Sequence, residues 1–125
     1  MQYNKIYLVI VILSICCSCN NYSVTSTNEN LLNKVNSIDN QWVNYTGVIE
    51  TNNKMMQSQF IPYNASNQYL LNNDAYVSYF SGEDFIKTKL HEGNDSVLQT
   101  VEEADGIILS FNKENKSGIK LVRID

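Results

Sequence analysis

The sequence predicts an all-β domain built from short antiparallel strands. From residue 41 onward, aromatic and β-branched residues recur in short runs separated by turn signals rich in Asn, Asp and Gly. About seven or eight such runs follow one another at a spacing of roughly ten residues, which is typical of an antiparallel sandwich or barrel. Helix-friendly composition is confined to residues 99–105 of this region.

The predicted strands can be followed along the chain. The first covers residues 42–49 and ends at the turn formers of residues 51–54. The second leads into Pro62, the only proline, which confines this strand to a sheet edge or ends it. The remaining runs are residues 68–71, 75–80, 85–88, 97–101, 106–111 and 118–124.

Residues 75–80 predict a central strand. Side chains alternate between the two faces of a strand, so Tyr79 belongs to one face while Tyr76 and Phe80 belong to the other. Both faces therefore carry large side chains, which indicates a strand that is covered on both sides. We expect Phe80 to be buried.

The first 18 residues have the features of an export signal. Lys5 is the only charged residue before the apolar run of residues 6–13. This run is shorter than the about 20 apolar residues that a membrane-spanning helix needs. A positive start, a short apolar core and small residues before a cysteine resemble a bacterial lipoprotein signal. Such a signal places the protein in the cell envelope, outside the cytoplasm.

Three cysteines compete as the lipid-attachment residue. Ser18 supplies the small side chain that signal processing needs, so Cys19 is the predicted acceptor, with Cys17 and then Cys16 as alternatives. Cleavage before Cys19 would leave a mature domain without disulfides, attached to the membrane through its acyl chains. An uncleaved short anchor, or an apolar helix in the core, is the alternative interpretation.

Residues 19–40 predict a lipidated tether. The segment 20–30 is polar and rich in Asn, as flexible linkers are. Leu31, Val35 and Ile38 follow a helical spacing, which predicts a short helix over about residues 29–37, with a partly ordered linker as the alternative. The expected organisation is a signal peptide (1–18), a tether (19–40) and a β-sandwich domain (41–125).

Composition and motifs favour binding over catalysis. The net charge of −4 and the pI near 4.9 argue against nucleic-acid phosphates as a partner. His91 is the only histidine and the chain has no Gly-x-Ser-x-Gly turn, so no nucleophile–base pair is predicted and His91 is expected to be an exposed loop residue. One histidine without mature thiols is too little for zinc. We therefore expect no enzymatic activity, no metal and no cofactor.

Acidic residues gather in predicted turns, at residues 83–84 and 102–105. Glycosidases use paired carboxylates, but turn positions favour solvated charges. Together with residues 94–95, the second group offers a calcium site as an alternative, because calcium takes six to eight oxygen ligands. No Asp-x-Asp-x-Asp spacing supports that alternative.

Aromatic residues are the predicted ligand contacts. The chain has eight tyrosines and one tryptophan. Flat rings can stack on the C–H faces of sugars while neighbouring amides bind the hydroxyls; the alternative is ordinary core and edge packing with the polar tip in water. The candidates near strand ends or loops are Trp42, Tyr45, Tyr63 and Tyr69.

Several segments follow the order of a known class of module. They are Thr46-Gly47-Val48-Ile49, Ser58-Gln59-Phe60-Ile61-Pro62-Tyr63, Tyr76-Val77-Ser78-Tyr79-Phe80 and Phe85-Ile86. Over residues 43–124 the chain resembles the small jelly-roll-like β-sandwich modules found beside SGNH-type hydrolases and in bacterial or prophage surface proteins. The arginine often found there near the position of Ile108 is absent. The resemblance implies a jelly-roll-like antiparallel sandwich and a carbohydrate-binding or adhesive accessory role.

Two functions follow from these observations. The first is a lipid-anchored, non-catalytic surface module that binds a glycan or an envelope protein. The alternative is a structural, assembly or immunity lipoprotein that docks to another envelope protein.

Overall fold

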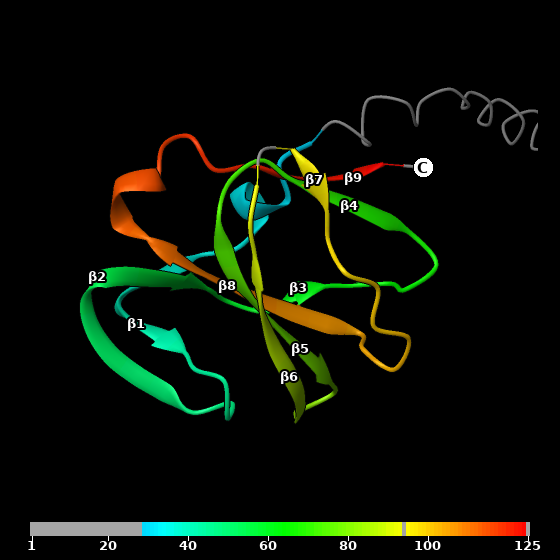
Figure 1. Cartoon of the computed structure of the whole chain (residues 1–125), viewed down its shortest axis with the longest axis horizontal. Helices are drawn as coiled ribbons and strands as arrows, with labels where there is room; N and C mark the ends of the chain where they lie inside the picture. The colour runs from blue at the N-terminus through cyan, green and yellow to red at the C-terminus, as the bar shows by residue number, and fades with distance from the viewer. Residues whose placement is uncertain (1–28, 94, 125) are drawn as a thin grey trace, which may run out of the picture.

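The computed structural model describes residues 29–93 and 95–124, which form two antiparallel β-sheets (Figure 1). The larger sheet has the strand order β1-β2-β8-β5-β6, with β3 paired to β8, and the smaller sheet has the order β7-β4-β9. The described part of the chain contains two short 3-10 helices and no α-helix. The predicted all-β antiparallel sandwich is confirmed.

From β3 onward the strands keep the order of the predicted runs, but the predicted strand 97–101 is wrong, because only Val97 of it lies in a strand. The elements of the described residues follow in chain order. They are η2 (Leu31–Lys34), β1 (Ser37–Val43), β2 (Ile49–Ser58), β3 (Ile61–Pro62), β4 (Gln68–Leu71), β5 (Ala75–Ser81), β6 (Asp84–His91), β7 (Ser96–Val97), β8 (Gly106–Asn112), η3 (Lys113–Asn115) and β9 (Leu121–Ile124). Within residues 29–93 and 95–124, no helix has the length and apolar character needed to cross a membrane.

The main core lies between the two sheets. Val77 and Tyr79 of β5 and Leu109 of β8 belong to the same buried cluster as Leu71 of β4 and Leu121 of β9, and each is at most 1% exposed. Burial of one such side chain stabilises the fold by about 1.5–3 kcal/mol. Strand β5 lies between β8 and β6, so its predicted central position is confirmed.

The predicted first strand, residues 42–49, is wrong, because a turn divides it. β1 ends at Val43 and β2 begins at Ile49. The side chain of Asn44 accepts hydrogen bonds from two backbone N–H groups of the intervening turn, which stabilises the turn over extended chain. Residues 51–54, predicted to end a strand, lie inside β2.

The pairing of β1 with β2 changes register where these polar residues lie. Asp39 pairs with Met56, whereas Gln41 pairs with Thr51, so residues 52–55 have no partner in β1. Extra residues on one strand bend it and increase its twist. Figure 1 shows the result, a strongly curved β2 that leads away from β8.

We call residues 41–51 the arm, because the bend folds them over the face of the larger sheet that lies opposite the main core. The backbone N–H of Val43 donates to Ser110 Oγ of β8 at 3.1 Å. The Val43 side chain joins Phe80 and Ile108 in a second buried cluster. Phe80 is 9% exposed, which confirms its predicted burial.

Residues 30–40, predicted to end the tether, pack on the domain. The predicted helix over residues 29–37 is reduced to the single turn of η2. Asn30 fixes this turn to the β9 segment: its Oδ1 accepts from Leu121 N at 3.0 Å and its Nδ2 donates to the Ile119 carbonyl at 3.2 Å. The strand starts at Ser37, because β1 pairs antiparallel with the end of β2 from that residue on, with Ser37 opposite Ser58.

Candidate binding surface

Three aromatic rings gather on the outer side of the larger sheet. The Trp42 ring lies 4.7 Å from Tyr76 and 6.4 Å from Tyr45, and Tyr45 lies 5.8 Å from Tyr76, measured between centroids. Tyr45 is 57% exposed, whereas Trp42 and Tyr76 are half-buried. We call these three residues the aromatic cluster. It presents ring surface to solvent from β1, from the turn that follows β1 and from β5.

The arm holds the cluster together. Trp42 is near the end of β1, Tyr45 is in the turn after it, and Tyr76 comes from β5, far along the chain. The turn rests on the β6 ring of Phe85, and a Cβ placed on Gly47 would lie 2.5 Å from Phe85 Cγ. Only glycine allows so close an approach at the observed φ of +84°.

Polar side chains flank the rings. Gln41 Nε2 donates to Gln57 Oε1 at 3.2 Å, and Asn44 Nδ2 donates to Glu50 Oε2 at 2.8 Å. Gln57 is 2% exposed, and Asn44 Oδ1 already accepts from Thr46 N and Val48 N. The acceptor capacity that remains for a ligand therefore lies on Gln41 and Glu50. Rings with amides and a carboxylate beside them suit a ligand that has both C–H faces and hydroxyl groups.

Tyr63 and Tyr69, two of the four predicted ligand contacts, belong to the core. They are 6% and 4% exposed, and their rings stack with centroids 5.0 Å apart. Their hydroxyls accept backbone hydrogen bonds from Val101 N at 3.2 Å and Asn64 N at 2.9 Å. Burial raises the pKa of Tyr63. Ring burial with a satisfied hydroxyl is the packing alternative that the sequence left open.

The structure therefore brings together Trp42 and Tyr45 and adds Tyr76. The prediction treated Tyr76 only as part of a strand. Alternation along the strand was the available signal, because it places Tyr76 on the face opposite Val77. The structure shows that this face also carries the partly exposed Leu90 of β6, which pairs with Tyr76. The predicted lipid-attachment residue Cys19 lies outside the described residues.

His91 is not the exposed loop residue that was predicted. It ends β6 and is 8% exposed, with Nε2 2.9 Å from Ser96 Oγ and 3.4 Å from the Leu71 carbonyl oxygen. Ser96 Oγ also donates to the Glu92 carbonyl at 3.3 Å. These contacts join β6 of the larger sheet to β4 and β7 of the smaller one, which accounts for the burial of the ring.

Two aspartates between strands bind backbone N–H groups, Asp105 of the predicted acidic turns and Asp74 after β4. Asp105 Oδ1 accepts from Gly82 N and Asp74 Oδ1 accepts from Gly93 N, each at 2.9 Å. Asn94, part of the calcium alternative, lies outside the described residues. Among residues 29–93 and 95–124, no group of three or more His, Cys, Asp and Glu side chains is close enough to hold a metal ion.

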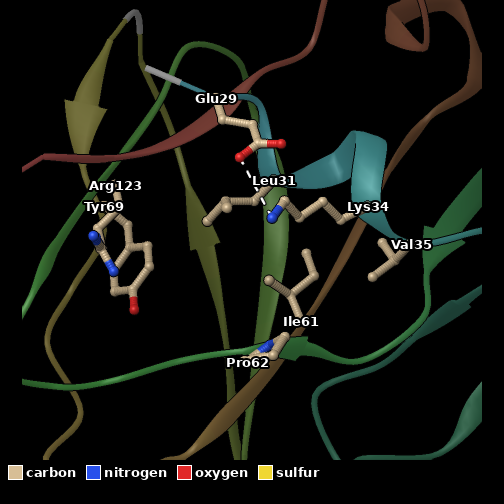
Figure 2. A pocket seen from close by; sticks show the side chains of 8 residues that line it. All are labelled: Glu29, Leu31, Lys34, Val35, Ile61, Pro62, Tyr69 and Arg123. Carbon is tan, nitrogen blue, oxygen red and sulfur yellow. Dashed lines mark ion pairs between the residues drawn. The ribbon is translucent and has the colours of Figure 1, made fainter. Parts of the chain in front are cut away.

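A pocket opens beneath η2, with a volume of about 370 Å³ (Figure 2). Tyr69 and Ile61 line it from the core, and Leu31 lines it from η2. Lys34 and Arg123 bring positive charge to its wall. We call it the η2 pocket.

No known protein family, no curated protein and no solved structure matches this chain.

Proposed function

We propose that this protein is a non-catalytic binding module of the bacterial cell envelope, attached to a membrane through acyl chains on Cys19. The features of residues 1–18 support export and lipid attachment. The resemblance of residues 43–124 to small surface sandwich modules supports an accessory, adhesive role. The alternative is a structural, assembly or immunity lipoprotein.

The aromatic cluster is the contact surface of the proposed module, and the exposure of Tyr45 is the observation that carries this proposal. Tyr45 is the most exposed aromatic ring among the large hydrophobic side chains of the described residues, at 57%. An exposed ring keeps its apolar surface in water and contributes little to the stability of the fold, whereas stacking on a sugar face removes that surface from water. Glycan is therefore the ligand class that we favour.

A specific observation also supports a protein partner. Val48 and Ile49 lie beside the cluster on the arm and are 55% and 56% exposed. Neighbouring exposed apolar side chains are typical of protein contact surfaces. Under this alternative, the arm docks to another envelope protein.

Replacing Tyr45 by alanine is expected to weaken retention on immobilised cell-wall glycans by about tenfold or more, since an anchoring ring is worth about 2 kcal/mol. The melting temperature should fall by only a few degrees, because the ring is mostly in solvent and its edge contacts with Trp42 and Tyr76 contribute about 1 kcal/mol. Val48→Ala is the matched control: it removes a side chain of similar exposure from the same turn and leaves all three rings.

Equal retention of Tyr45→Ala and wild type would contradict the glycan site. If the wild type is retained on no glycan, while Val48→Ala weakens capture by an envelope protein, the docking alternative is supported.

Replacing Cys19 by alanine is expected to abolish lipid labelling and to release the protein from membranes. Acyl chains are the predicted membrane attachment, and no polybasic segment supplements them. Metabolic labelling with a fatty acid and membrane fractionation measure both effects. Label that persists until Cys17 is also replaced would move the attachment site to Cys17.

A further inference from the structure

We propose that the η2 pocket binds a small carboxylate that carries a compact apolar group. The apolar walls come from three separate segments. Leu31 and Val35 belong to the η2 segment, Ile61 and Pro62 form β3, and Tyr69 belongs to β4. A volume of about 370 Å³ falls in the range of small-ligand sites, which are mainly apolar with few polar groups.

The charged wall selects an anion. Among the described residues that line the pocket, Lys34 and Arg123 are cations and Glu29 is an acid. Lys34 Nζ lies 3.4 Å from Glu29 Oε1, but both side chains are well exposed, at 59% and 43%. Exposed ion pairs of this kind contribute little, so Lys34 can turn toward a ligand carboxylate with little loss.

Arg123 places the second cation closer to the apolar walls. It is half-buried on β9, directly opposite Tyr69 of β4. Figure 2 shows Arg123 beside Tyr69 on one side of the pocket and Lys34 on the other. A planar guanidinium can bind a carboxylate through two parallel hydrogen bonds.

The pocket is preformed, because hydrogen bonds fix its roof to its walls. Asn30 Oδ1 accepts from both Leu32 N and Leu121 N, which ties η2 to the strand that carries Arg123. On the other side, Gln59 N donates to the Asn36 carbonyl at 2.9 Å, next to β3. A site that is already ordered spends less of its binding free energy on ordering itself.

This chemistry is shared by a free N-acylated amino acid and by the C-terminal residue of a peptide. Both present one carboxylate next to one apolar side chain, and both match two cations above an apolar floor. The proposal does not rest on the aromatic cluster, since none of its three rings lines the η2 pocket.

The test titrates ¹⁵N-labelled protein with N-acetyl-leucine and, separately, with the neutral N-acetyl-leucinamide. We expect the carboxylate to shift the amide signals of Leu31, Lys34 and Tyr69, and the amide analogue to bind at least tenfold more weakly. A short peptide ending in leucine, with a free or an amidated C-terminus, distinguishes a peptide terminus from a free small acid.

Two variants test which cations of the pocket bind the ligand carboxylate. Arg123→Gln is expected to weaken N-acetyl-leucine binding about tenfold, and Lys34→Gln several-fold, by loss of a charged hydrogen bond. Lys87→Gln is the matched control, because Lys87 is an exposed cation on β6 and does not line the pocket. Lys34 is well exposed, so its variant reports binding even if Arg123→Gln lowers the melting temperature.

Equal affinity for the acid and the amide would overturn the proposal, as would unchanged binding by both Lys34→Gln and Arg123→Gln. No shift of the pocket signals at millimolar ligand overturns it as well. Tyr45→Ala must bind N-acetyl-leucine like the wild type, which keeps the outcome separate from that of the proposed function.

Discussion

Replacing Phe80 by alanine is expected to lower the free energy of unfolding by about 3–5 kcal/mol. Phe80 is the aromatic residue of the second buried cluster, which lies between the arm and the larger sheet. Its centroid lies 5.0 Å from that of Phe60 and 5.7 Å from that of Phe85, and Val43 of the arm belongs to the same buried cluster. Its loss leaves a cavity between the arm and the larger sheet, which the paired strands cannot close.

Urea unfolding followed by far-UV circular dichroism measures the Phe80 effect. Phe60→Ala is the control, because it removes the same kind of ring from a position that is 44% exposed and in tilted contact with Phe80. Its expected cost is about 1 kcal/mol, the value of an aromatic pair with partial burial. A Phe80→Ala cost no larger than that of Phe60→Ala would show that the second cluster contributes little to stability.

Replacing Gly47 by alanine is expected to cost about 2–5 kcal/mol, through two additive effects. The φ of +84° is unfavourable for a residue with a Cβ, by roughly 1–2 kcal/mol. The new Cβ would also lie 2.5 Å from Phe85 Cγ, and such overpacking costs about 1–3 kcal/mol. The arm must move, so the contact of Trp42 with Tyr76 should weaken as well.

Two other glycines separate these effects. Gly82 also has a positive φ, of +60°, but a Cβ there meets nothing within 4 Å, so Gly82→Ala carries only the backbone cost. Gly118→Ala meets nothing within 4 Å either and has no positive φ, so it should be close to neutral. Thermal unfolding of the three variants, with tryptophan fluorescence as a reporter of Trp42, makes the comparison. Equal costs at Gly47 and Gly82 would contradict the Phe85 contact.

The strands could be read from the sequence because alternation and turn signals are local. Residues 68–71 form β4 as predicted, and residues 75–80 account for nearly all of β5. The burial of Phe80 followed from bulk on both faces of one strand, which requires no knowledge of its neighbours. The all-β class, the central position of β5 and the buried Phe80 are therefore properties of the amino-acid pattern.

The arrangement of the strands in space decided which tyrosines are buried and which residues form the candidate sites. Tyr63 and Tyr69 have the same local character as Tyr45, yet they are buried. Tyr63 follows β3 of the larger sheet and Tyr69 lies on β4 of the smaller one, and their rings meet in the core between the sheets. Tyr76 meets Trp42 only because β2 bends at residues 52–55 and carries the arm over β5. Burial depends on which segments become neighbours, and long-range pairing sets this after local preferences are satisfied. The aromatic cluster and the η2 pocket, each assembled from distant segments, appear only in the folded chain.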